Sequence, residues 1–61
     1  MRFEILTKPH GKNWRLEKSG DFASPIWSDW EREHLTELLN SGNKFLRLNN
    51  MLFNKVEDTN Q

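Results

Sequence analysis

The sequence predicts a small α+β domain: a four-stranded, mostly antiparallel sheet in the order β-β-α-β-β, with one amphipathic helix packed on one face. Segments toward both ends of the chain alternate apolar and polar residues, which is the pattern of half-buried strands. A single central segment repeats apolar residues at helical spacing. With 61 residues the chain can form only one domain. It contains no cysteine, so three tryptophans and four phenylalanines must supply much of the core.

Residues 1–18 are predicted to form the first hairpin. Phe3 and Ile5 would share one face of its first strand, because side chains alternate along a strand. The opposite face of that strand would carry Arg2, Glu4 and Leu6. Trp14 and Leu16 would point inward from the second strand. The loop between the two strands contains proline and glycine, which favour turns.

A connector over 19–27 leads to a helix predicted over 28–41. Ser28 and Glu31 have the spacing of a capping box, in which each side chain accepts a hydrogen bond from the other residue's backbone. Gly42 supplies the stop after the helix. The stripe expected to pack on the sheet consists of Trp30, His34, Leu35, Leu38 and Leu39. The opposite side would carry Asp29, Arg32, Glu33, Thr36 and Glu37.

Residues 44–56 are predicted to form the second hairpin, turning at Asn49-Asn50, with a polar tail over 57–61. One face of this hairpin would carry Leu46, Leu48, Met51 and Phe53. The opposite face would carry Phe45, Leu52 and Val56. One helix covers only one face of a small sheet, so something else must cover the second apolar face. The alternatives are a second copy of the chain, a different protein, or the tail or connector folded back over it.

The surplus apolar face predicts a protein-binding module and not an enzyme. The candidate protein-binding residues are Phe45, Arg47, Leu52, Val56 and Trp27. An apolar centre with a charged rim, here Arg47 and Lys55, is ordinary interface anatomy, and tryptophan is enriched among residues that dominate binding. Exposed sheet edges also invite strand addition. The expected partner is another protein, or the chain itself as a homodimer.

Size and composition suggest what such binding would do. Small cysteine-free proteins of this kind are common among the regulators of phages and mobile elements that bind and modulate a host enzyme. Inhibition of a larger protein is therefore the expected role.

The alternative function is that of a small nucleic-acid-binding regulator. Residues 1–20 carry five cations against two carboxylates, a net charge of +3, whereas residues 21–40 carry five carboxylates against one arginine. The candidate nucleic-acid contacts are Lys8, Lys12, Trp14 and Arg15. Such cations can lie on phosphates while the aromatic ring stacks on a base. The zero net charge and the acidic helix oppose this alternative. A variant stays open, in which the helix imitates nucleic acid with Asp29, Glu31, Glu33 and Glu37.

Catalytic, metal and cofactor chemistry lack a supporting constellation in the sequence. Every serine has a turn or cap position, and the chain has no glycine-rich phosphate loop. Glu31 and His34 have ligand spacing on one helical face, but such metal sites take ligands from several helices. His34 is therefore interpreted as a core-edge histidine with one hydrogen bond. We expect no cofactor and no metal.

The N-terminus and the hydropathy of the chain predict a location. The first six residues lack the apolar run and the cleavage site of a signal peptide. No segment approaches the roughly 20 apolar residues that cross a membrane. A complete small gene product in the cytoplasm, without membrane contact, is therefore expected.

Overall fold

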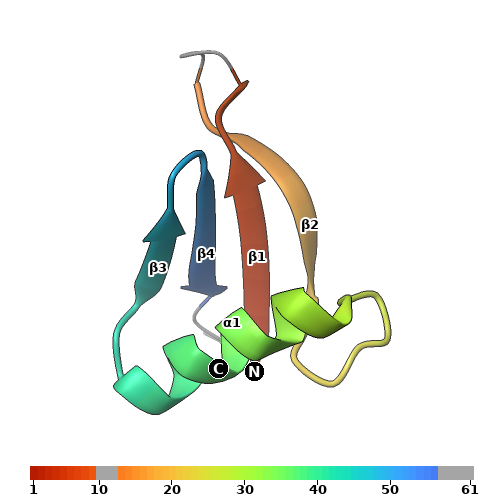
Figure 1. The fold of residues 1–61 in the computed structure, drawn as a ribbon. Coiled ribbons are helices and arrows are strands. Elements are labelled where there is room, and N and C mark those ends of the chain that lie inside the picture. Colours follow the sequence, from red (N-terminus) through yellow and green to blue (C-terminus); the bar gives the residue numbers. More distant parts are fainter. Residues whose placement is uncertain (10–12, 57–61) are drawn as a thin grey trace, which may run out of the picture.

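The computed structural model describes residues 1–9 and 13–56, and it contains a four-stranded sheet with one helix lying across one face (Figure 1). The elements follow the chain as β1 (Arg2–Thr7), β2 (Arg15–Asp21), α1 (Asp29–Ser41), β3 (Phe45–Leu48) and β4 (Met51–Val56). The strands pair antiparallel throughout the described sheet. The predicted α+β fold and its order of elements are therefore confirmed. The predicted tail and the loop residues His10, Gly11 and Lys12 lie outside the described residues.

The first and last strands pair with each other in the middle of the sheet, whose order is β2-β1-β4-β3. This pairing joins the two predicted hairpins and leaves β2 and β3 at the edges (Figure 1). A central strand is hydrogen-bonded on both sides, whereas an edge strand keeps one side of its backbone free. The two faces and the two edges, β2 and β3, are therefore the parts of the sheet that are available for binding.

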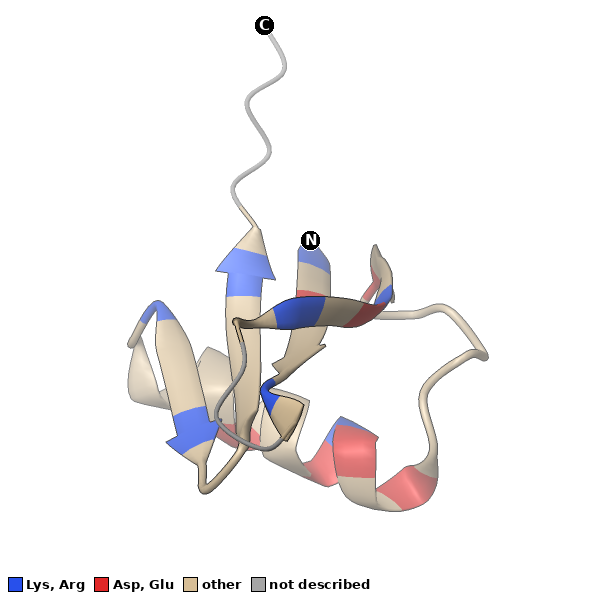
Figure 2. Ribbon diagram, turned by 90° about the horizontal axis from the view of Figure 1, so that it is seen from above, with Lys and Arg blue, Asp and Glu red and all other residues tan. Residues whose placement is uncertain are grey.

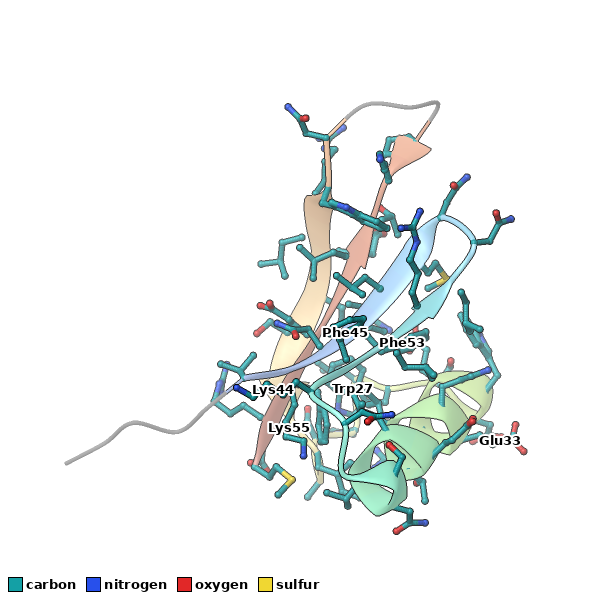
Figure 3. The ribbon with its side chains drawn as sticks, turned by 90° about the vertical axis from the view of Figure 1, so that its left-hand side faces the viewer. Trp27, Glu33, Lys44, Phe45, Phe53 and Lys55 are labelled. Atoms are coloured by element: carbon teal, nitrogen blue, oxygen red, sulfur yellow. The ribbon has the colours of Figure 1, made fainter. Side chains whose placement is uncertain are left out.

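The core lies between the sheet and α1. Its buried side chains are Phe3, Ile5, Trp27, Leu35, Leu38 and Phe53. The three that come from the strands have no exposed surface at all. Figure 3 shows Phe53 and Trp27 on the helix side of the sheet. The strand positions predicted to face inward from β1 and β4 thus form the floor of the core.

The second hairpin has the predicted register. Leu46 lies opposite Phe53, and Leu48 lies opposite Met51. Asn49 adopts a positive φ of 53°, which the tight turn between the strands requires. The alternate residues of both strands therefore point to the face away from the helix, as expected.

The prediction that Trp14 and Leu16 point into the core is wrong. A register shift in the β1–β2 pairing places Leu16 opposite Leu6, on the face turned away from α1. One extra residue in a bulged strand reverses the alternation of side chains beyond it, and the apolar–polar pattern does not reveal this change. Leu16 is 60% exposed, and Trp14 precedes β2 and lies outside the core cluster.

The connector between β2 and α1 lies on the helix side of the sheet. It starts three residues later than predicted, because β2 continues to Asp21. Phe22 packs edge-on against Phe3 with ring centroids 5.7 Å apart. Trp27 is 5% exposed, and its indole N–H donates to the Asp21 carbonyl at 2.8 Å. Arg32 of α1 donates to the Phe22 carbonyl at 2.6 Å. The connector therefore packs on the helix side and does not cover the opposite face, which excludes it as the cover of the second apolar face.

The ends of α1 are formed as the sequence predicts. The Ser28 hydroxyl accepts from the Glu31 amide, and the Glu31 carboxylate accepts from the Ser28 amide. Gly42 follows the helix with a φ of 78°, in the left-handed region. Leu35 and Leu38 are buried as expected, whereas Trp30, at the N-terminal end of the predicted stripe, is nearly half exposed.

Candidate protein-binding surface

The sheet face turned away from α1, here called the outer face, carries rows of side chains that run across the strands. The first row consists, from β2 to β3, of Leu16, Leu6, Leu52 and Arg47. We call its three apolar members the leucine row. Neighbouring strands lie about 4.8 Å apart, so the leucine row extends over roughly 10 Å. Leu16 is the most exposed member, and Leu6 and Leu52 are half-buried.

Polar side chains interrupt the outer face next to the leucine row. The second row consists of Ser19, Glu4, Asn54 and Phe45. The Asn54 amide donates to the Glu4 carboxylate at 2.9 Å, so a hydrogen-bonded pair occupies the middle of this row. Phe45, at the β3 edge, is 57% exposed. The most exposed apolar side chains of the outer face are therefore those of Leu16 in the leucine row and of Phe45.

Four of the five predicted protein-binding residues share the outer face: Phe45, Arg47, Leu52 and Val56. Val56 lies in a third row, beside Arg2. Trp27 does not lie with them, because it is buried in the core on the helix side (Figure 3). Lys55, predicted at the rim, pairs with Phe3 and therefore belongs to the helix side as well. The apolar strand residues predicted for the binding surface therefore do share one face, whereas the predicted tryptophan belongs to the core.

Leu6 and Leu16 belong to this surface although neither is among the predicted binding residues. The sequence pattern does indicate the face that carries Leu6, because alternation places it opposite to Phe3 and Ile5. The missing information was the pairing of β1 with β4, which brings Leu6 next to Leu52. The sequence pattern does not indicate the face that carries Leu16, because the register shift moves this side chain to the opposite face of the sheet.

Trp14 lies at the Arg47 end of the outer face, where three segments of the chain meet. Its ring centroid is 5.6 Å from the Lys8 ammonium nitrogen and 5.3 Å from the central carbon of the Arg47 guanidinium. The Lys8 amide donates at 3.0 Å to a carbonyl of the β3–β4 turn. We call Lys8, Trp14 and Arg47 the Trp14 cluster. It joins one predicted protein-binding residue to two predicted nucleic-acid contacts. Of the other two predicted contacts, Arg15 is exposed but pairs with Thr7 on the helix side of the sheet, and Lys12 lies outside the described residues.

Charge is unevenly distributed between the helix and the sheet, as the sequence predicts (Figure 2). The exposed acidic residues of α1 are Asp29, Glu33 and Glu37. Glu31 is not one of them: it is 8% exposed and binds Lys18 at 2.8 Å. Burial raises the pKa of Glu31, but the hydrogen bonds from Lys18 and the helix N-cap outweigh burial and hold the pKa below its usual value. The acidic face of α1 therefore consists of Asp29, Glu33 and Glu37 and does not include Glu31.

The carboxylates on the outer side of the sheet are engaged within the chain. Glu4 is held by the amide donor described above, and Asp21 accepts from the N-terminal ammonium group at 3.0 Å. That hydrogen bond, with a second from a backbone amide, lowers the pKa of Asp21. Neither Arg2 nor Arg47 forms an ion pair with any residue that the structure describes. The outer face therefore presents cations beside its apolar residues.

His34 has the core-edge position that the sequence predicts. Its Nδ1 lies 2.8 Å from the Trp30 carbonyl oxygen, and its ring stacks on Phe53 with centroids 5.3 Å apart. These contacts make His34 part of the packing between α1 and β4. Within residues 1–9 and 13–56, no three histidine, cysteine, aspartate or glutamate side chains gather closely enough to hold a metal ion. Within the same ranges, no helix has the length and apolar character needed to cross a membrane.

Comparison of the chain with models of protein families, with curated proteins and with solved structures finds no match. The proposals below are therefore argued from the geometry, exposure and charge of the described residues.

Proposed function

We propose that this protein is a small non-enzymatic module that binds a larger protein through the outer face of its sheet and inhibits it. The supporting observation is the exposure of apolar side chains on that face, where Leu16 is 60% and Phe45 is 57% exposed. Apart from the Trp14 cluster at one end, no described helix or strand lies over these residues (Figure 1). Apolar side chains that gather on one exposed face are typical of an interaction surface.

The cations on the outer face indicate the kind of partner surface that would complement it. Arg47 ends the leucine row, and Arg2 lies two rows away, while the carboxylates beside them are engaged within the chain. Lys8 adds a further cation at the Trp14 end. A partner surface with an apolar centre and carboxylates around it would complement this arrangement.

Covering the exposed apolar side chains would contribute favourable free energy to binding. Burying a whole leucine or phenylalanine side chain contributes about 1.5–3 kcal/mol. More than half of Leu16 and of Phe45 is exposed, so covering each of them would contribute about 1–2 kcal/mol. The half-buried members of the leucine row would add less. A few residues of this kind dominate the affinity of many interfaces.

The test is a pull-down of the tagged protein from bacterial lysate, with and without nuclease, followed by mass spectrometry. It compares the wild type with Leu16→Asp, which places a charge on the leucine row at a position exposed enough for the fold to tolerate it. Thr36→Asp is the matched control, since it adds the same charge on the exposed side of α1. Circular dichroism verifies that both variants are folded.

The proposal expects one stoichiometric protein that survives nuclease, that Thr36→Asp retains and that Leu16→Asp loses. The isolated partner's activity should then fall when the wild-type protein is added. A partner retained equally by both folded variants would show that the outer face is not the binding surface.

Nucleic-acid binding is the second candidate, and the Trp14 cluster is the observation that favours it. The cluster brings two cations against an aromatic ring. Arg15 is exposed at the start of β2, but it pairs with Thr7 and therefore belongs to the helix side of the sheet. Cations could contact phosphates, and the ring could stack on a base after one cation moves aside. The acidic residues of α1 would stay on the opposite side of the sheet from such a ligand (Figure 2).

The double variant Lys8→Glu with Arg47→Glu tests this candidate, because these are the two cations of the Trp14 cluster. Binding to single-stranded DNA or RNA should weaken by more than tenfold, and its dependence on salt should flatten, because fewer counterions are released. If the wild type does not shift any DNA or RNA at low salt, nucleic acid is not the ligand.

A further inference from the structure

The outward side of β3 has free backbone groups. The Lys55 amide of β4 donates to the carbonyl of Lys44, the residue before β3, at 2.9 Å. These two residues therefore form a hydrogen-bonded pair. Hydrogen-bonded and non-bonded pairs alternate along an antiparallel ladder. Phe45 and Arg47 therefore belong to non-bonded pairs, and their N–H and C=O groups point away from β4. These groups have no backbone partner among the described residues.

The side chains of the same two residues lie on the outer face, and both residues are exposed. Figure 3 shows Phe45 and Phe53 on opposite sides of the sheet. Figure 1 shows β3 at the margin of the sheet, with no other described strand beyond it. Phe45 and Arg47 thus present backbone hydrogen-bonding groups and side chains along one accessible edge.

We propose that β3 pairs antiparallel with β3 of a second copy of this chain, about a two-fold axis at Leu46, so that two sheets join into one. The outward groups belong to Phe45 and Arg47, so Phe45 of each copy would pair with Arg47 of the other. This arrangement provides four backbone hydrogen bonds across the axis. It also keeps both helices on the same side of the joined sheet, because the axis is perpendicular to the sheet.

Side-chain chemistry selects this register over its neighbours. Directly opposed residues share a face, so the Phe45 ring would lie beside the Arg47 guanidinium of the other copy, a favourable cation–π arrangement. The guanidinium would then lie between this ring and Trp14 of its own chain. A shift in one direction places two Arg47 side chains opposite each other, which is repulsive. A shift in the other direction leaves Arg47 opposite Asn43, which lies outside the strand.

The expected dimer is weak, because a four-residue edge strand buries little surface. Interfaces well below about 1,200 Å² belong to transient complexes. We therefore expect monomers at about 10 μM and a large fraction of dimers at about 1 mM. The inference does not depend on the proposed function, since it concerns the purified protein alone.

The test combines sedimentation equilibrium with amide hydrogen exchange by NMR over that range of concentration. The amides of Phe45 and Arg47 should exchange more slowly as the concentration rises. The amides of Leu46 and Leu48, which face β4, should change little and serve as the internal control. A wild type that stays monomeric at about 1 mM overturns the proposal.

Two variants test the edge itself. Arg47→Pro removes one outward N–H without removing a hydrogen bond to β4, and proline is tolerated on edge strands. Dimerisation should weaken at least tenfold in this variant. Arg47→Glu keeps the backbone and replaces the cation–π contact by a carboxylate beside Phe45, and it should also weaken the dimer about tenfold. It keeps the test decisive if the proline variant does not fold. A dimer of unchanged affinity in a folded variant would place the interface elsewhere.

Discussion

The two faces of the sheet are made from the same strands and differ mainly in what lies against them. Phe53 is fully buried, whereas its neighbour Leu52 is half-buried on the outer face. Ile5 and Leu6 of β1 show the same contrast. Because side chains alternate, each of these strands offers apolar residues to both sides. Apolar residues become core only where a second layer of structure covers them.

Two tryptophans show how differently the two sides treat the same residue type. Trp27 is buried under the sheet, and its indole N–H is satisfied by the Asp21 carbonyl. Trp14 keeps contact with solvent, and its ring centroid lies 5.6 Å from the Lys8 ammonium nitrogen and 5.3 Å from the central carbon of the Arg47 guanidinium. On the helix side an aromatic ring fills space, whereas at the end of the outer face it organises cations.

The largest difference is expected between Phe53→Ala and Leu52→Ala. Phe53→Ala leaves a cavity under α1 and should lower the free energy of unfolding by about 3–5 kcal/mol, which is most of the stability of a domain this small. Leu52→Ala removes a half-buried side chain and should cost about 1 kcal/mol. Urea denaturation followed by circular dichroism measures both. Equal losses would show that the outer face is covered in solution, and the proposed binding surface would then fail.

A smaller effect is expected from Glu31→Gln, which removes the charge that Lys18 binds on the helix side. Hydrogen bonds to charged groups contribute about 1.5–3 kcal/mol, so a loss of about 1–2 kcal/mol at neutral pH is expected after the exposed part of the pair is allowed for. Glu33→Gln, on the exposed side of α1 (Figure 3), is the control and should change stability little.

The same variant predicts a pH dependence. Folding lowers the pKa of Glu31 below its ordinary value of 4.5, so the folded state binds fewer protons than the unfolded state in that range. The stabilisation is therefore complete above pH 4.5 and is lost as the pH falls through the lowered pKa. Thermal unfolding at several acidic pH values should show a shallower loss for Glu31→Gln than for the wild type. Parallel curves would contradict the role assigned to the Lys18 contact.

The smallest effect is expected at Gly42, which separates α1 from β3. Its φ of 78° lies in the left-handed region, and a Cβ there would meet no atom within 4 Å. Gly42→Ala should therefore cost about 1 kcal/mol through backbone strain alone. Asn40→Ala, in the last turn of α1, is the control and should be neutral or stabilising. A shift in the thermal midpoint of Asn40→Ala as large as that of Gly42→Ala would argue against strain.

Much of the fold is predictable because its signals are local. The capping box of Ser28 and Glu31 and the stop at Gly42 depend on residues within a turn of each other. The register of the second hairpin follows from its two-residue turn and the alternation on both sides of it. The same alternation places Phe45, Arg47, Leu52 and Val56 on one face.

The errors arise where a distant part of the chain decides the outcome. Leu16 changes sides because of a register shift that only its pairing with β1 reveals. Glu31 is buried because its carboxylate, besides capping the helix, also binds Lys18, thirteen residues earlier in the chain. Trp14 lies outside the core and contacts Arg47 of β3, the edge strand on the other side of the sheet from β2. In each case the local pattern was compatible with two positions, and a contact from far along the chain selected one.

The sequence by itself determined the order of elements, the ends of the helix and the presence of more apolar residues than one helix can cover. These properties depend on periodicity and on interactions between near neighbours. The tertiary structure alone decided that β1 and β4 pair in the centre, which aligns Leu6 with Leu52 and leaves β3 at an edge. Which strands pair is a long-range choice, because it depends on which combination buries the most apolar surface beneath α1.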